Sequence, residues 1–273
     1  RVCLLILDNC EHLVSACAQL ADTLLRTCPY LRILATSREP LGVSGEATWP
    51  VPPLSLPTPQ PWRSPTSGQD ALPIYEQSEA IRLFTERATA VSPSFLLTTE
   101  NGVWVADICR RLDGMPLAIE MAAGRVPTLS VQQIAARLDN RFQLLTGGSR
   151  TAPPRQQTLV ATLDWSYALL TEAEQHVLLR LAVFAGGCTL SAAEAICASD
   201  ELTSNEVLPA LSNLVNKSWV TVARTPNRRR YHLLETIRQY AREKLTAVKA
   251  IEPTRTCHLD YFLRWTEENE PHL

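Results

Sequence analysis

The sequence predicts an α/β segment followed by helical domains, and three patterns support this fold class. Two apolar runs, residues 4–7 and 31–36, flank a segment of helical length. A proline-rich stretch comes next, and most of the remaining chain carries apolar residues at helical spacing. A strand, a helix and a second strand within so few residues predict a βαβ unit with parallel strands and a right-handed crossover.

The predicted βαβ unit carries polar residues where its strands end. Residues 11–28 repeat apolar side chains every three or four positions, which predicts an amphipathic helix that stops at Pro29. Asp8 follows the first run and Arg38 the second. Because parallel strands bring their carboxyl ends to one edge, where open α/β sheets bind ligands, Asp8 is a candidate Mg²⁺ ligand and Arg38 a candidate phosphate sensor.

Bulk composition excludes several classes of protein. The 273 residues carry a net charge of −2, so the whole chain does not attract nucleic acid strongly. No apolar run reaches the roughly 20 residues that span a bilayer. The chain starts on a predicted strand without Met, so we expect a fragment of a longer cytoplasmic protein, with no signal peptide and no membrane partner. The eight cysteines show no zinc or C-x-x-C spacing, and we expect small buried thiols.

Five segments follow from the composition. We expect a partial sheet core at 1–49, a Pro-rich connection at 50–76, a helical domain at 77–149, a winged-helix domain at 150–247 and the start of a helical, TPR-like segment at 248–273. Eight of the 19 prolines lie between 50 and 73, which excludes a helix there, and we expect a mobile portion near 64–70. A second polar joint is predicted at 150–154.

Helices of the two middle domains are predicted from periodicity and caps. The helical domain is expected to have helices at 78–91, 100–112, 117–125 and 130–138, with Ser78 and Ser130 as N-caps. The next domain is expected to have helices at 158–170, 171–184, 191–198, 206–217 and 235–245, and Thr171 with Glu174 fits a capping box. A hairpin at 219–222 and 231–233, turning at Pro226 and Asn227, completes a winged helix–turn–helix, and a last helix is expected at 259–270.

Four motifs occur in one order along almost the whole chain. They are LLILDNCEH at 4–12, LATSREPL at 34–41, GMPLAIE at 114–120 and YHLLETIRQYA at 231–241. Together they closely resemble the STAND-class, NB-ARC-like ATPase module of bacterial transcriptional regulators, which is fused to LuxR-type or SARP-type DNA-binding domains. The resemblance implies the C-terminal part of a P-loop NTPase sheet, then a helical bundle and a winged helix.

The resemblance also implies a nucleotide-driven switch in signalling or transcription. Such modules hold ADP in a closed state, exchange it for ATP, open and often oligomerise, and hydrolyse ATP slowly. Partners would be the nucleotide with Mg²⁺, the effector and sensor domains of the parent chain and a second copy, while DNA is contacted through another domain.

Seven positions acquire roles from this resemblance. Asp8 becomes the Walker B acid and metal ligand, and Arg38 the sensor arginine, with hydroxyls from Thr36 and Ser37. Gly114 and Pro116 belong to the motif whose proline packs on adenine. Glu11 is a candidate catalytic base, because Asn9 replaces a second acid and cannot take a proton. Each position also has a purely structural alternative. Asp8 could cap the following helix, and Glu11 could interact favourably with the helix dipole. Arg38 could pair with Glu39, and Pro116 could simply follow a turn.

Two features depart from the pattern. Leu234 stands where relatives have a phosphate-contacting His, and His232 is expected to point elsewhere. There is no G-x-x-x-x-G-K-[ST] sequence, so we expect the phosphate loop upstream of Arg1 and little nucleotide binding or ATPase activity by the fragment alone.

Two alternative functions remain open. Asn9 and Leu234 favour a degenerate protein-interaction scaffold without nucleotide chemistry. Arg228, Arg229 and Arg230 in the predicted wing could contact phosphates in a winged-helix DNA binder. The alternative is a solvated turn, and the resemblance favours an internal regulatory role for this winged helix.

Overall fold

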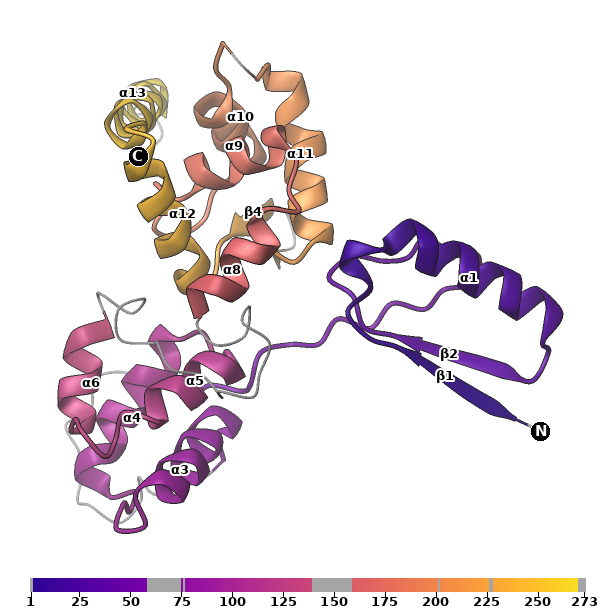
Figure 1. The fold of residues 1–273 in the computed structure, drawn as a ribbon. Coiled ribbons are helices and arrows are strands. Elements are labelled where there is room, and N and C mark those ends of the chain that lie inside the picture. Colours follow the sequence, from indigo (N-terminus) through magenta and orange to yellow (C-terminus); the bar gives the residue numbers. More distant parts are fainter. Residues whose placement is uncertain are drawn as a thin grey trace. The chain divides into compact units, whose positions relative to one another are not determined.

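The computed structural model describes residues 2–57, 75, 77–138, 159–200, 202–225 and 228–269. Internal contacts group residues 51–168 into one unit, and 1–50 with 169–273 into another. Figure 1 follows the chain from the indigo βαβ segment through the magenta helices to the orange and yellow winged helix. Each segment is described by itself. The predicted joint at 150–154 and the stretch at 64–70 lie outside the described residues.

The N-terminal segment is the expected βαβ unit. Strand β1 (Cys3–Leu7) leads through a short 3-10 helix, η1 (Cys10–His12), into α1 (Val14–Thr27), and β2 (Leu31–Ala35) follows. The strands pair in parallel, from Cys3 opposite Leu31 to Leu7 opposite Ala35. The predicted parallel pair is therefore confirmed, although the helix predicted as continuous from residue 11 is divided into η1 and α1 at Leu13.

One face of this sheet is open to solvent. Leu4, Ile6 and Leu34 expose 57%, 60% and 54% of their surface, whereas Leu5 and Ile33, which point the opposite way, are half-buried. The two apolar runs thus form strands that bury one face only. Within the described residues the sheet contains β1 and β2 alone, and so shows no P-loop NTPase sheet.

The middle unit is a helical bundle. Its helices are α3 (Glu79–Val91), α4 (Thr99–Arg111), α5 (Pro116–Ala123), α6 (Val131–Arg137) and α8 (Leu159–Tyr167). Ser78 and Ser130 accept hydrogen bonds from the backbone N–H groups of Ile81 and Gln133, as the predicted caps require. Helix α3 packs on α5, and α4 on α6. The largest fully buried side chains here are Phe84, Ile81, Ile108, Leu112, Ile119, Ile134, Leu138 and Leu159.

The first residues of the Pro-rich connection belong to this bundle. The N–H of Leu54 donates to the Gly114 carbonyl at 3.0 Å, and the N–H of Ser55 donates to Glu79 Oε2 at 3.0 Å. The N–H of Glu79 in turn donates to Ser55 Oγ, and Pro57 is buried. Proline prevents a helix here, but an extended chain with free backbone groups can still bind along a helix end.

The C-terminal segment is a winged helix. Three helices, α9 (Glu172–Leu181), α10 (Leu190–Cys197) and α11 (Ser204–Asn216), precede the hairpin of β3 (Thr221–Thr225) and β4 (Arg228–His232), and α12 (Glu235–Ala247) follows. The strands are antiparallel, and Cys188 adds a bridge to Tyr231 on the other edge of β4. The predicted order of elements and the Thr171–Glu174 capping box are confirmed. The turn at Pro226 and Asn227 lies outside the described residues.

The last helix starts earlier than predicted. Helix α13 (Ile251–Asn269) contains Pro253 in its first turn, a position where the missing N–H has no partner to lose. The predicted start at residue 259 is therefore eight residues late. The ring of His258 contacts Phe184, with centroids 5.0 Å apart, and this contact fixes α13 to the winged helix.

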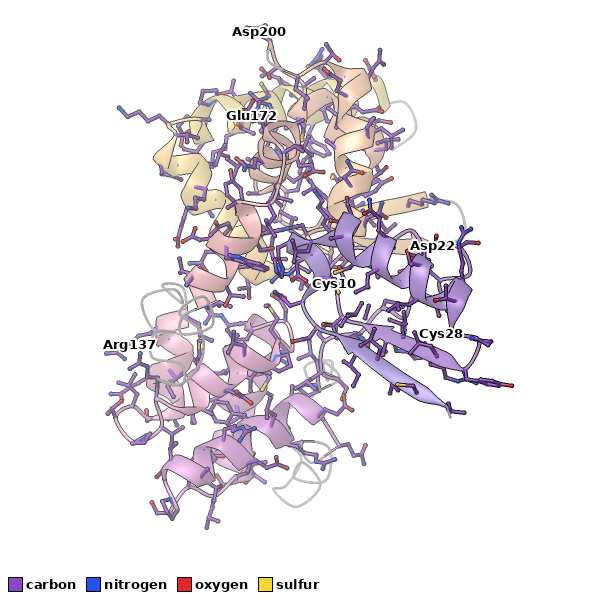
Figure 2. The ribbon with its side chains drawn as sticks, turned by 45° about the vertical axis from the view of Figure 1, so that its right-hand side comes forward. Cys10, Asp22, Cys28, Arg137, Glu172 and Asp200 are labelled. Carbon is purple, nitrogen blue, oxygen red and sulfur yellow. The ribbon has the colours of Figure 1, made fainter. Side chains whose placement is uncertain are left out.

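Cysteine burial differs from the expectation. Cys10, Cys109, Cys188 and Cys197 are buried, but Cys3, Cys28 and Cys257 are exposed, so the buried-thiol prediction is wrong for these three. Figure 2 labels Cys10 and Cys28 near the two ends of α1. All eight thiols are free. Among the described helices, none combines the length and apolarity that crossing a membrane requires.

Candidate functional site

The carboxyl ends of β1 and β2 meet as predicted. One hydroxyl group and one carboxyl group are in contact there. Thr36 Oγ1 donates to Asp8 Oδ1 at 2.5 Å and accepts the N–H of Asn9 at 2.9 Å. The N–H of Cys10 donates to the Thr36 carbonyl at 2.9 Å. Asn9 adopts a left-handed conformation, with φ of 63°, which turns the chain sharply into η1. Asp8, Thr36 and Ser37 are exposed.

Arg38 faces Glu11 across this edge. Arg38 Nε lies 3.5 Å from Glu11 Oε1, and their side chains are 33% and 10% exposed. Burial lowers the pKa of Arg38, and the nearby Glu11 carboxylate opposes that shift. The carboxylate in contact therefore belongs to η1, and the pairing of Arg38 with Glu39 stays an untested alternative. The sharp turn at Asn9 explains why sequence spacing did not reveal this pair.

The strand-end groups fit a hard cation only as a partial site. An exposed carboxylate on Asp8 is the kind of oxygen that Mg²⁺ takes, together with waters and substrate phosphates. The described residues contain no group of three or more His, Cys, Asp or Glu side chains placed to hold a metal. A cation at Asp8 would thus need further oxygens from its ligand.

Gly114 and Pro116 lie in the other unit, at the start of α5. A Cβ on Gly114, whose φ is 69°, would stand 2.4 Å from the Leu54 carbonyl oxygen. Close packing against the chain at Leu54 therefore accounts for this glycine. Pro116 is exposed at the first turn of α5, and the structure does not place it beside Asp8 or Arg38.

The winged helix has a glycine loop that sequence reasoning missed. A Cβ on Gly187 would lie 2.5 Å from both His232 Nδ1 and the Tyr231 carbonyl oxygen. Arg230 Nη2 donates to the carbonyls of Gly186 and Gly187, at 3.2 and 3.0 Å. The two adjacent glycines before the helix predicted at 191 are the sequence feature that could have indicated this close backbone approach. Arg230 is thus a brace between the wing and this loop as well as a surface cation.

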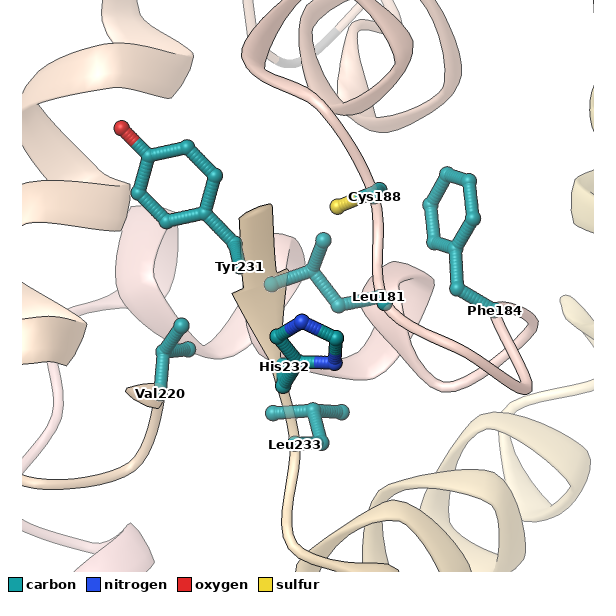
Figure 3. A pocket seen from close by; sticks show the side chains of 8 residues that line it. Leu181, Phe184, Cys188, Val220, Tyr231, His232 and Leu233 are labelled. Atoms are coloured by element: carbon teal, nitrogen blue, oxygen red, sulfur yellow. The ribbon is translucent and has the colours of Figure 1, made fainter. Parts of the chain in front are cut away.

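A hollow beside this loop is too small for a nucleotide. Figure 3 shows His232 on β4 turned toward Leu181 and Cys188, while the Tyr231 ring points the other way. The hollow has room for about one water molecule. Burial raises the pKa of Cys188 to about 12, so its thiol stays protonated. Leu234 is the N-cap residue of α12 and offers no polar side chain.

Positive charge on the winged helix is concentrated in the wing. Residues 170–246 contain nine Lys and Arg against eight Asp and Glu, a net charge of +1, but four arginines fall within 224–230. The exposed residues of α11 are mostly uncharged. They are Ser204, Asn205, Glu206, Leu208, Pro209, Ser212, Asn213 and Asn216. Lys217, which follows α11, is bound to Glu174 Oε2 at 2.8 Å.

Comparisons with known proteins agree with this architecture. Residues 170–246 match the family model of a winged helix–turn–helix domain. The chain is 49% identical over 245 residues to a "Putative HTH-type transcriptional regulator" of Mycobacterium tuberculosis, strain H37Rv, covering 90% of this chain and 26% of that protein. A protein of the same strain called uncharacterized is 46% identical over 244 residues, covering 89% of this chain and 57% of that protein. The chain thus spans about a quarter to a little over half of these relatives.

The fold and the family match together show that this chain contains a winged helix–turn–helix domain.

Proposed function

We propose that the chain is part of a transcription regulator that contacts DNA through its winged helix–turn–helix. The match of residues 170–246 to that domain is the observation that carries the proposal. A relative that shares 49% identity over most of the chain is named as a regulator of the same type. This is the alternative that the wing arginines suggested, and it is better supported than a nucleotide switch.

The charge distribution shapes how such contact would be made. Helix α11 occupies the recognition position, and its exposed Asn205 and Ser204 can hydrogen-bond base edges. It has no exposed Lys or Arg, so the phosphate contacts fall to the wing, where Arg229 is exposed on β4. With about two phosphates neutralised, log Kobs should fall against log salt with a slope near −2.

A titration of labelled duplex DNA with the chain at several salt concentrations tests this proposal. Binding that weakens steadily with salt supports contact through a few phosphates. No binding at low salt would leave the winged helix as a regulatory or protein-contacting part.

A second candidate function rests on the β1 and β2 edge. We propose that Asp8, Thr36 and Arg38 form part of a nucleotide site, in a module that switches between ADP and ATP. Two contacts at this edge support it: Thr36 bonds to Asp8, and Arg38 pairs with Glu11. The Mg²⁺ ion would sit against the Asp8 carboxylate, and Arg38, Thr36 and Ser37 would face phosphate oxygens. Gly114 and Pro116 would contact the base.

The nucleotide proposal is tested by equilibrium dialysis of ADP and ATP with Mg²⁺, using a chain extended to the length of its relatives. Loss of binding in Arg38→Ala supports the site. Absence of binding in the extended protein supports the scaffold alternative, in which Asn9 and Leu234 mark lost chemistry.

A further inference from the structure

Helix α11 presents amide and hydroxyl groups outward, and its sequence contains no Lys or Arg. Its inner side is buried at Val207 and Leu211. The residues on the opposite side recur at steps of four and three positions and are all exposed: Asn205, Pro209, Ser212 and Asn216. Leu208, beside this row, is 41% exposed. Glu206 is held at the helix start, because its Oε2 accepts the N–H and the hydroxyl of Thr203 at 2.8 and 2.7 Å.

These outward groups match adenine and thymine better than guanine. An Asn side chain can accept a hydrogen bond from adenine N6 and donate one to adenine N7, and an exposed leucine can contact the thymine methyl group. Guanine offers two acceptors in the major groove and is read most often by Arg or Lys, which α11 lacks. Recognition helices contact bases through their N-terminal residues, so Asn205 in the first turn is the candidate reader of adenine.

The hairpin that follows α11 exposes an arginine. The N–H groups of Trp219 and Val220 donate to the Leu214 carbonyl at 2.9 and 3.2 Å, which ties the start of the hairpin to the last turn of α11. Arg230 binds the carbonyls of the glycine loop, whereas Arg229 is exposed and points to the opposite face of β4.

The wing therefore favours the same base composition as α11. An element beside a helix in the major groove meets the neighbouring backbone and the minor groove beyond it. The minor groove of A·T-rich DNA is narrow and strongly negative, and it attracts an inserted arginine. Arg229 is placed on the wing to make such a contact.

We infer that this winged helix selects A·T-rich duplex DNA, with Asn205 reading adenine in the major groove and Arg229 entering the adjacent minor groove. Two separate features lead to the same bases: the uncharged amide row of α11 and the exposed arginine of the wing. The inference rests on the proposed DNA contact and names the class of DNA. Phosphate contacts alone would carry no base preference.

The test is a fluorescence-anisotropy titration of labelled duplexes of one length with the chain, at one low salt concentration. An A·T-rich duplex is compared with a G·C-rich duplex and with two analogues. Inosine lacks the N2 amino group of guanine, so inosine–cytosine pairs combine the minor groove of A·T with the major groove of G·C. In the second analogue, 7-deazaadenine removes N7 from the major groove. We expect A·T-rich DNA to bind about tenfold more tightly than G·C-rich DNA.

Each variant should remove one part of this preference. Arg229→Ala should lose the gain of inosine-containing DNA over G·C-rich DNA. Asn205→Ala should lose the difference between adenine and 7-deazaadenine. Arg242→Ala, which removes an exposed arginine on α12, is the matched control and should keep both differences. The base preference itself is measured on the unaltered chain and so does not depend on how the variants fold.

The outcomes separate this inference from the DNA proposal beneath it. Salt-dependent binding with equal affinity for the A·T-rich and G·C-rich duplexes, or with a preference for G·C, overturns the inference and leaves the DNA proposal standing. An A·T preference that both variants retain also overturns it, because other groups would then read the bases. No binding to any duplex overturns both.

Discussion

The hydroxyl of Thr36 lies 2.5 Å from Asp8 Oδ1 and joins the carboxyl ends of two strands that are 28 residues apart in sequence. The same oxygen accepts the Asn9 N–H at 2.9 Å, so one side chain fixes both the acid and the turn after it. This double role explains how Asp8, though exposed, is held at a defined place on the sheet edge.

Replacing Thr36 with Val should release Asp8 and leave the Asn9 N–H without its side-chain acceptor. We expect the free energy of unfolding of the βαβ segment to fall by about 1 kcal/mol. Thr36→Ser keeps the hydroxyl and is the matched control. Hydrogen exchange of the Asn9 and Cys10 amides measures the change, and equal protection in both variants would contradict it.

Lys217 and Glu174 make a nearly buried ion pair between the end of α11 and the start of α9. Lys217 Nζ lies 3.1 and 2.8 Å from the two carboxylate oxygens, and Glu174 is 1% exposed. Lys217→Met leaves the buried Glu174 carboxylate without its cation and should lower the free energy of unfolding by about 3 kcal/mol. In Glu174→Leu with Lys217→Met, only part of this loss should be recovered, because Glu174 also accepts the Thr171 N–H. Urea unfolding of both variants measures the coupling, and additive losses would argue against it.

Gly187 and Gly186 offer a matched pair for testing the wing brace. Gly187→Ala places a Cβ against the Tyr231 carbonyl oxygen at a φ of 75°, and should cost about 2 kcal/mol. A Cβ on Gly186 meets nothing within 4 Å, so Gly186→Ala should shift the unfolding free energy by less than about 0.5 kcal/mol. Thermal unfolding checks both variants, and equal melting temperatures would show that the loop does not pack on β4 as described.

His258 should make the attachment of α13 sensitive to acid. Burial lowers its pKa from the ordinary value of 6.5, so the folded chain binds its proton less readily than the unfolded chain. The stability contribution is therefore complete above that value and is lost as the pH falls toward the lowered pKa. The unfolding midpoint in urea should drop more between about pH 7 and pH 5 in wild type than in His258→Leu. Parallel midpoints in the two proteins would contradict this.

How far the sequence predicts the structure depends on the range of the interactions. Helix caps such as Ser78 and the apolar periodicity of the helices depend on local sequence. They therefore located the starts of most helices to within a few residues. The Glu11–Arg38 pair was missed because it depends on the left-handed turn at Asn9, which polar residues permit but do not require. Leu54 was assigned to a connection because proline content excludes helices but says nothing about docking onto Gly114.

The candidate site was predicted unevenly for the same reason. Asp8, Thr36 and Arg38 converge because parallel strands align their ends, a rule that sequence pattern alone can apply. Pro116 and Gly114 lie in a separate unit, and their role toward a nucleotide stays a prediction. In the wing, counting arginines did not reveal that Arg230 also holds the carbonyls of Gly186 and Gly187.

The most direct test of the central claim is the salt dependence of DNA binding by wild type, Arg229→Ala and a control, Arg242→Ala, which removes an exposed arginine on α12. If the wing contacts phosphate, Arg229→Ala should weaken binding and reduce the slope of log Kobs against log salt by about one, while Arg242→Ala keeps the wild-type slope. Identical isotherms for all three proteins, or no binding at low salt, would contradict DNA contact through this winged helix.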